Sequence, residues 1–146
     1  MKKILPIVFM ILMLVSCKED DVSQNGCVSN LLPNYGFDTG SEINLSLPLY
    51  NGLQFAGNSV FISNYGVRGI YLYNTGSSIV AYEASDPAHG PSSCSGMSIS
   101  GIELTCGCGD DNSYELLTGQ QTSGATGNCL RAYRAEQNGT IVRVYN

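Results

Sequence analysis

No stretch of this chain after residue 17 shows a sustained helical spacing of apolar residues, and this feature constrains its fold most. Short runs that alternate apolar and polar residues take its place. In 42–47, for example, Ile43, Leu45 and Leu47 would share one face of a strand before Pro48 ends it. Gly occurs 17 times and Trp is absent. This usage is typical of a turn-rich β protein, so we expect an all-β domain.

The expected strands are short, and turn residues separate them. The last two are joined by 137–139, where an Asn-Gly pair is a strong hairpin signal. A long loop without a strand pattern is expected at 84–96, and loops of this length often carry function. A second loop is expected at 118–128. The other expected strands are 52–55, 59–63, 69–73, 78–83, a pair within 97–105, 113–117, 130–136 and 140–145.

The first residues have the three parts of a secretory signal: a basic start at Lys2 and Lys3, an apolar run over 4–15 and a short polar exit. The run is too short for a spanning helix, which needs about 20 apolar residues. The tetrad Leu14-Val15-Ser16-Cys17 resembles the lipobox, in which the Cys takes a diacylglycerol and becomes the first mature residue. We therefore expect a signal peptide at 1–16 and lipidation of Cys17. An ordinary signal peptide with a chance Cys is the alternative.

The run Lys18-Glu19-Asp20-Asp21 resembles the acidic signal that sends many Bacteroidetes lipoproteins to the outer surface of the outer membrane; a solvated tether is the alternative. Residues 17–30 are predicted to form a flexible tether and 31–146 one small domain. The net charge of −5, without clustered Lys and Arg, argues against nucleic-acid binding. The expected partners are the membrane, through the lipid, and an unidentified envelope protein or redox partner.

Six motifs follow one another over nearly the whole mature domain. They are GVRGIYLYN at 66–74, VAYEA at 80–84, GIELTCGCG at 101–109, YELLTG at 114–119, SGA at 123–125 and LRAYR at 130–134. In this order and spacing they resemble the Rieske-like lipoproteins of Bacteroidetes, a branch of the Rieske iron–sulfur fold. The resemblance implies a small antiparallel β-sandwich or barrel with a subdomain that presents two cluster loops.

A Rieske protein holds a [2Fe-2S] cluster with two Cys on one iron and two His on the other, from a Cys-x-His loop and a Cys-x-x-His loop. Asp86 stands at the first Cys position and Ala88 at the first His position, with His89 one place further along. Cys106 keeps the second Cys position, but Gly109 replaces the second His. Ala and Gly side chains offer no lone pair, so we expect the ordinary cluster to be absent. If any metal is bound, His89 and Cys106 are its candidate ligands.

The resemblance also implies a disulfide between Cys94 and Cys108, which occupy the places of the bridge that ties the two cluster loops together. An exported protein sits in an oxidising compartment, where paired cysteines are more often bridged than metal-bound. Closing this loop of about 14 residues would be worth roughly 3 kcal/mol. Cys27, Cys106 and Cys129 then remain, an odd number, and both Cys27–Cys129 and Cys106–Cys129 are open.

Two functions are compatible with these residues. The first is a membrane-anchored, non-catalytic accessory or binding module that kept the Rieske scaffold and lost its cluster. The second is an electron carrier with an altered [2Fe-2S] or other metal centre. An enzyme is not expected, because the chain has one His and no convincing nucleophile–base pair. Asp110 and Asp111 are interpreted as solvated charge in a turn. A rival metal site would use His89, Cys94, Cys106 and Cys108.

Overall fold

The computed structural model describes residue 27, residues 31–125 and residues 127–146. The predicted signal peptide (1–16), the lipidation site Cys17 and all of the predicted tether except Cys27 lie outside the described residues. Within the described part, the fold is all-β as predicted: every strand pairing is antiparallel, and the one helix is a single short 3-10 helix. No helix in this part has the length and apolar character needed to span a bilayer.

The larger of the two sheets has six strands in the order β1-β10-β9-β4-β3-β2. Strand β4 pairs directly with β9, where Ala81 lies opposite Tyr133. The residues between β4 and β9 therefore form an insertion that starts and ends at neighbouring strands of this sheet. The strands of this sheet are β1 (Ile43–Asn44), β2 (Ser59–Ile62), β3 (Ile70–Asn74), β4 (Ile79–Glu83), β9 (Ala132–Asn138) and β10 (Ile141–Tyr145).

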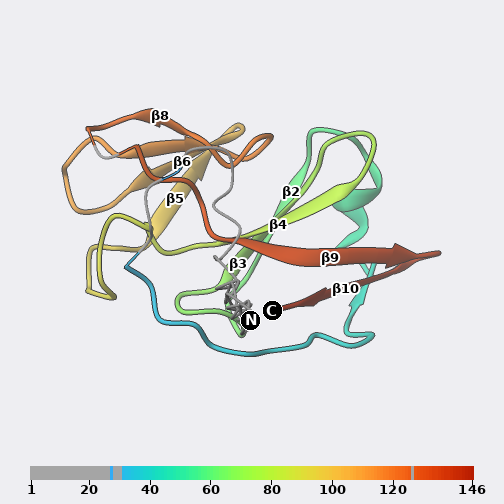
Figure 1. Cartoon of the computed structure of the whole chain (residues 1–146). Coiled ribbons are helices and arrows are strands. Elements are labelled where there is room, and N and C mark those ends of the chain that lie inside the picture. Colours follow the sequence, from blue (N-terminus) through green and yellow to red (C-terminus); the bar gives the residue numbers. More distant parts are fainter. Residues whose placement is uncertain (1–26, 28–30, 126) are drawn as a thin grey trace, which may run out of the picture.

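The segment between β4 and β9 forms a second, four-stranded sheet in the order β5-β6-β7-β8. These strands are β5 (Met97–Ser100), β6 (Glu103–Cys106), β7 (Ser113–Glu115) and β8 (Gln121–Ser123). Figure 1 shows β5, β6 and β8 gathered on one side of the larger sheet, away from the hairpin of β9 and β10. The smaller sheet is thus a separate layer that carries its own connecting loops.

Strand β3 separates two hydrophobic cores, because successive side chains of a strand point to opposite faces. Ile70 and Leu72 belong to the core formed within the larger sheet. Tyr71 and Tyr73 belong to the second core, which joins the two sheets. The smaller sheet and its flanks contribute Met97, Leu104, Tyr114, Leu116 and Leu130 to this second core. Because β3 is covered on both faces, the smaller sheet is firmly seated on the larger one.

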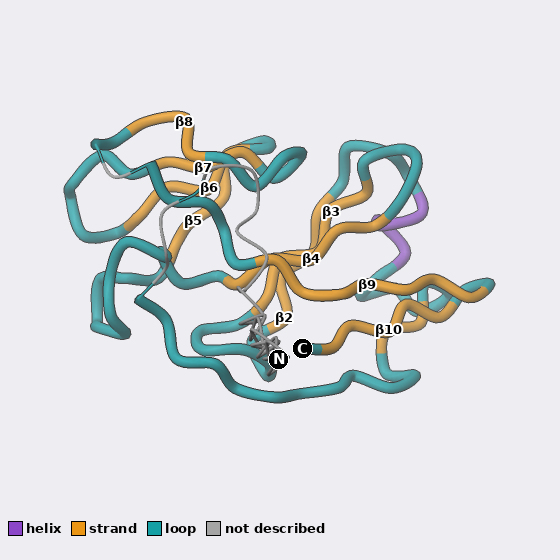
Figure 2. The backbone as a smooth tube through the Cα atoms, viewed as in Figure 1, coloured by secondary structure: helices purple, strands orange, loops and turns teal. Residues whose placement is uncertain are grey.

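Two expected strands differ in the structure. Residues 52–55 do not form a strand; Asn51–Gln54 is a 3-10 helix, drawn in purple in Figure 2. Its Leu53 is fully buried, so this apolar residue fills the end of the first core from a helical turn. The strand expected at 42–47 ends after Asn44, whose side chain accepts a hydrogen bond from the Ser46 N–H and starts a turn.

Strand β8 lies within 118–128, where we predicted a loop, and that prediction was wrong. Its residues are polar and partly or fully exposed at the edge of the smaller sheet. An edge strand that buries nothing has no apolar alternation to reveal it. The predicted final hairpin is confirmed, with Gly139 in the left-handed region (φ 59°) of its turn.

Glu83, the last residue of β4, is a fully buried carboxylate at the junction of the two sheets. It accepts hydrogen bonds from the N–H groups of Val67 (2.7 Å), Arg68 (3.0 Å) and Ser85 (3.1 Å). The Tyr133 hydroxyl also donates to it over 2.7 Å. Burial raises the pKa of Tyr133, and the hydrogen bond to Glu83 raises it further. Glu83 therefore fixes the turn before β3 against the end of β4.

The glycine at position 66 is required by this arrangement. Its φ is +74°, which favours glycine, and a Cβ there would lie only 2.4 Å from Glu83 Oε2. Any side chain at Gly66 would push the carboxylate out of its site.

Replacing Glu83 with Ala should lower the free energy of unfolding by about 3 kcal/mol or more, because three N–H groups and the Tyr133 hydroxyl would lose their buried acceptor. Denaturant titration of the purified protein measures this loss. The matched control is Glu136→Ala, which removes an exposed carboxylate and should change stability by about 0.5 kcal/mol or less. Equal effects of the two substitutions would contradict this role of Glu83.

Candidate functional site

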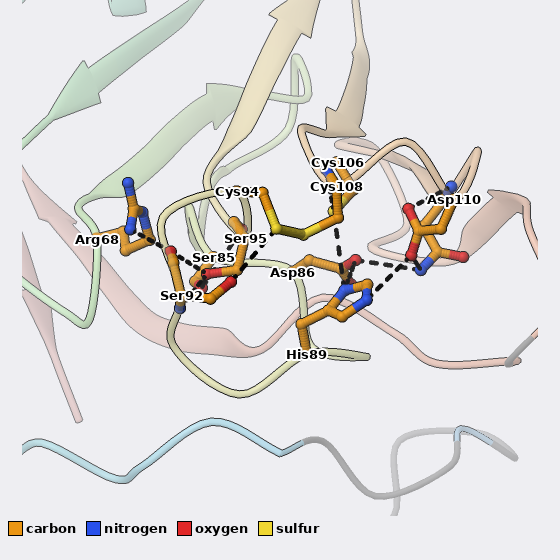
Figure 3. Close-up of a disulfide and its surroundings, with 11 residues drawn as sticks. Arg68, Ser85, Asp86, His89, Ser92, Cys94, Ser95, Cys106, Cys108 and Asp110 are labelled. Carbon is orange, nitrogen blue, oxygen red and sulfur yellow. Dashed lines mark hydrogen bonds and ion pairs between the residues drawn. A yellow bond between two sulfur atoms is a disulfide. The ribbon is translucent and has the colours of Figure 1, made fainter.

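Two loops meet at one end of the smaller sheet. The first loop, residues 84–96, connects β4 to β5, and the second loop, residues 107–112, connects β6 to β7. The N–H of Gly107 donates to the Gly96 carbonyl, and a Cβ on Gly107 would lie 2.8 Å from the Cys94 carbonyl oxygen. Only glycine permits this approach of the two backbones. Figure 3 shows the side chains that the two loops bring together.

The Cys94–Cys108 disulfide joins the first loop to the second, with the two Cα atoms 4.7 Å apart (Figure 3). This is the pairing that the family resemblance implied. Cys129 pairs with Cys27, with their Cα atoms 5.5 Å apart, so the structure takes one of the two pairings that the sequence left open. Cys106 is the one cysteine without a disulfide among the described residues.

The Asp86 side chain lies at the centre of the site and is fully buried. Its Oδ1 accepts hydrogen bonds from the Ala88 N–H (2.9 Å) and the Tyr114 hydroxyl (2.6 Å). Its Oδ2 lies 2.8 Å from His89 Nδ1 and accepts a 3.1 Å hydrogen bond from the Asn112 amide. The contact with the Ala88 N–H two residues along forms the turn that brings His89 back over Asp86.

The pKa of Asp86 is lowered from its ordinary value of 3.8. Burial alone would raise it, but hydrogen bonds from the Cys106 thiol, the Tyr114 hydroxyl, the Ala88 N–H and the Asn112 amide outweigh burial. The converse applies to Tyr114: burial raises the pKa of its hydroxyl, and donation to Asp86 raises it further. Asp86 is therefore held as a carboxylate inside the protein.

His89 lies between two carboxylates. Its Nδ1 faces Asp86 Oδ2 at 2.8 Å and its Nε2 faces Asp110 Oδ2 at 3.2 Å. The Asn112 amide donates to Asp110 Oδ2 (2.6 Å) as well as to Asp86, so it bridges the same two carboxylates. A ring protonated on both nitrogens donates to both carboxylates, whereas a neutral ring donates to one. The cluster is net negative in either case.

Cys106 is buried beside this pair, at the end of β6. Its Sγ lies 3.8 Å from His89 Nδ1 and accepts a hydrogen bond from the Cys108 N–H. The pKa of the Cys106 thiol is raised to about 12, first by burial and then by its hydrogen bond to Asp86. The negative charges of Asp86 and Asp110 also raise this pKa, whereas the hydrogen bond from the Cys108 N–H lowers it. The thiol is therefore protonated at neutral pH.

The structure brings together three of the site residues predicted from the sequence: Asp86, His89 and Cys106. Ala88 and Gly109 adjoin them but present no donor side chain. The prediction of a rival metal site that included Cys94 and Cys108 was wrong, because these two cysteines form a disulfide with each other.

Asp110 was interpreted as solvated charge in a turn, and it is an exposed residue of the second loop, but its carboxylate also faces His89, which was not predicted. Asp110 lies one place beyond Gly109, just as His89 lies one place beyond Ala88. The same one-residue displacement on both loops is the sequence signal that could have identified it. Asn112 and Tyr114 donate hydrogen bonds to Asp86 but have no comparable sequence signal, because they lie outside the Cys-x-His and Cys-x-x-His cluster motifs.

Four side chains of this site could hold a metal ion: Asp86, His89, Cys106 and Asp110, each with one donor atom within 4.8 Å of the others. The donors are two carboxylate oxygens, an imidazole nitrogen and a sulfur. Their types suit a divalent transition metal better than Ca²⁺ or Mg²⁺, which prefer oxygen alone.

Replacing Asp86 with Asn should lower the free energy of unfolding at pH 7 by about 3 kcal/mol, because the buried donors would lose a charged acceptor. The native carboxyl has a lowered pKa, so its stabilisation is complete well above pH 4 and is lost as the pH falls through that lowered value. The difference in the free energy of unfolding between the native protein and Asp86→Asn should therefore become smaller as the pH falls. Denaturant titrations of both proteins from pH 7 to pH 3, in the presence of a metal chelator, measure this difference. Asp111→Asn, at an exposed neighbouring residue, is the control. A difference in the free energy of unfolding that does not change with pH would contradict the role of Asp86 as a buried carboxylate.

No protein-family model matches this chain, and comparison with curated proteins gives no match either. Among solved structures, it is similar to a chain from a complex of reduced oxygenase and oxidized ferredoxin in carbazole 1,9a-dioxygenase, with 21% identity and a TM-score of 0.44 over 62% of this chain and 82% of the other. It is also similar to the ferredoxin of carbazole 1,9a-dioxygenase from Nocardioides aromaticivorans IC177, with 17% identity and a TM-score of 0.42 over 62% and 86%. These identities and scores are too low to transfer any property of those proteins to this chain.

Proposed function

We propose that this protein is an exported lipoprotein of the outer membrane, built on a Rieske-type scaffold that no longer holds a [2Fe-2S] cluster, and that it acts as a non-catalytic accessory or binding module. The observation that carries this proposal is the buried Asp86 carboxylate, which stands at the first Cys position of the cluster motif. Its two oxygens are already in contact with five groups of the protein itself, four of them in the loops and β7 and the fifth the Cys106 thiol.

The donor set does not fit the cluster. A Rieske cluster needs two thiolates and two imidazoles. The two loops offer one thiol, Cys106, and one imidazole, His89, because Cys108 is bonded to Cys94. Moreover, His89 Nδ1 is in direct contact with Asp86 and only 3.8 Å from the Cys106 sulfur. A cluster between these side chains would have to separate all three.

The state of the same residues supports a non-catalytic role. The thiolate, not the thiol, is the nucleophile of cysteine, and burial beside Asp86 keeps the Cys106 thiol protonated. His89 is the only histidine of the chain, and both its ring nitrogens face carboxylates. No activated nucleophile–base pair is therefore formed at this site.

The two disulfides support export, because bridged cysteines are characteristic of oxidising compartments. Cys27 is bonded to Cys129, and it follows the proposed lipidation site Cys17 by ten residues. Ten extended residues reach about 35 Å at most, so an anchored domain would stay close to the membrane surface. The run Lys18-Glu19-Asp20-Asp21 favours the outer face as its location. A module held this way meets partners at that surface.

The mature protein, extracted from membranes in mild detergent, should be colourless and contain neither iron nor acid-labile sulfide. Absorption spectroscopy with iron and sulfide analysis tests this, before and after anaerobic incubation with ferrous iron and sulfide. Stoichiometric iron with visible absorption would overturn the proposal and favour the electron-carrier alternative.

Replacing Cys17 with Ala should prevent lipidation, so that the protein no longer partitions with the membrane and loses the mass of the lipid. Membrane fractionation and intact-mass analysis measure the two effects. Cys27→Ala is the control: it removes a cysteine ten residues further along and should leave both lipid and membrane association unchanged. Membrane association of Cys17→Ala equal to that of the native chain would disprove the anchor.

A further inference from the structure

We propose that the two loops bind one divalent transition-metal ion of the zinc class, with Asp86, His89 Nδ1 and Cys106 as its protein ligands and Asp110 as the group that orients the histidine. This inference rests on the proposed function, because the ion would occupy the place left by the lost cluster.

Three donor atoms already converge on one point. His89 Nδ1 lies 2.8 Å from Asp86 Oδ2 and 3.8 Å from Cys106 Sγ, and the Cys106 thiol donates to the Asp86 carboxylate. Protons hold this arrangement together. A metal ion bound at the same point would replace the proton on the thiol, released to solvent, and would take the lone pair of a neutral His89.

The spacing of the donors suits a small ion. Zn²⁺ binds oxygen, nitrogen and sulfur at about 2.0–2.3 Å, which places the ligand atoms of a tetrahedral site roughly 3.3–3.8 Å apart. The contact between Cys106 and His89 already has this spacing, and the contact between Asp86 and His89 would have to open by about half an ångström. His89 can make that adjustment, because its side chain is 34% exposed.

The surrounding groups match the support that metal ligands receive in proteins. A ligating histidine usually donates its second ring N–H to a carboxylate, and Asp110 Oδ2 is placed for this at 3.2 Å from His89 Nε2. The Tyr114 hydroxyl and the Ala88 N–H hold the far oxygen of Asp86, and the Asn112 amide joins Asp86 to Asp110. Figure 3 shows His89 between the Asp86 and Asp110 carboxylates, beside Cys106.

Charge and donor type also favour a cation of this class. Two carboxylates against one imidazole leave the cluster negative, and a sulfur with an imidazole selects Zn²⁺ or Co²⁺ over Ca²⁺ and Mg²⁺. The partial exposure of His89 and Asp110 gives the ion a route from solvent and leaves room for a water as fourth ligand.

The test is titration of the mature, detergent-extracted protein with Co²⁺, after chelation and without reductant, so that the Cys94–Cys108 disulfide stays intact. We expect one Co²⁺ per chain, with a thiolate-to-cobalt charge-transfer band and the visible bands of a four-coordinate ion, both abolished by Zn²⁺. Cys106→Ser should remove the charge-transfer band, and His89→Gln should weaken binding at least tenfold. Asp110→Asn should weaken it about 10- to 100-fold, as loss of an orienting carboxylate does.

Asp111→Asn is the matched control and should bind Co²⁺ like the native chain; circular dichroism shows whether each variant is folded. The metal site would be overturned if the folded, iron-free protein gave no charge-transfer band. It would also be overturned if Cys106→Ser kept that band. Either result would leave the proposed function intact. Iron and sulfide in the protein as purified would overturn both.

Discussion

The buried carboxylate of Asp86 is the interaction on which the two loops depend. An ionised group inside a protein costs several kcal/mol unless hydrogen bonds replace its water. Here the replacements come from four places: the Cys106 thiol of β6, the Ala88 N–H of the first loop, the Asn112 amide of the second loop and the Tyr114 hydroxyl of β7. The first loop can therefore close only when the second loop and β7 are in place, which makes the site and its supporting sheet one cooperative unit.

A second fully buried carboxylate, that of Glu83, lies three residues before Asp86. Glu83 ends β4 as a fully buried carboxylate and joins the turn before β3 to the junction of the sheets. The short segment from Glu83 to Asp86 thus anchors the larger sheet at one end and the two loops at the other. Between them, Ala84 packs in the second core, and Ser85 pairs with Gly96. Rigid placement of the loops follows from this segment more than from the loops themselves.

The strands that could be predicted from the sequence carry either a run or an alternation of apolar residues. Strands β3 and β4 are buried along most of their length, whereas β10 of the final hairpin buries alternate residues, and all three were predicted. Strand β8 was missed because its polar edge residues show no alternation of apolar and polar positions. The 3-10 helix was missed because its one buried residue, Leu53, cannot by itself show a helical spacing. The contact of Asp110 with His89 was missed because the two residues are 21 positions apart and only the closed loops bring them together.

The thiol of Cys106 and the neighbouring disulfide coexist for a physical reason. Exchange requires a thiolate to attack a disulfide sulfur, and Cys106 is only two residues from Cys108 in the chain. Burial and the hydrogen bond to Asp86 keep the thiol protonated, so the attacking species is scarce at neutral pH. The same carboxylate that closes the loops thus also protects the bridge between them. Loss of the Asp86 charge would weaken both the closure of the loops and the protection of the Cys94–Cys108 bond.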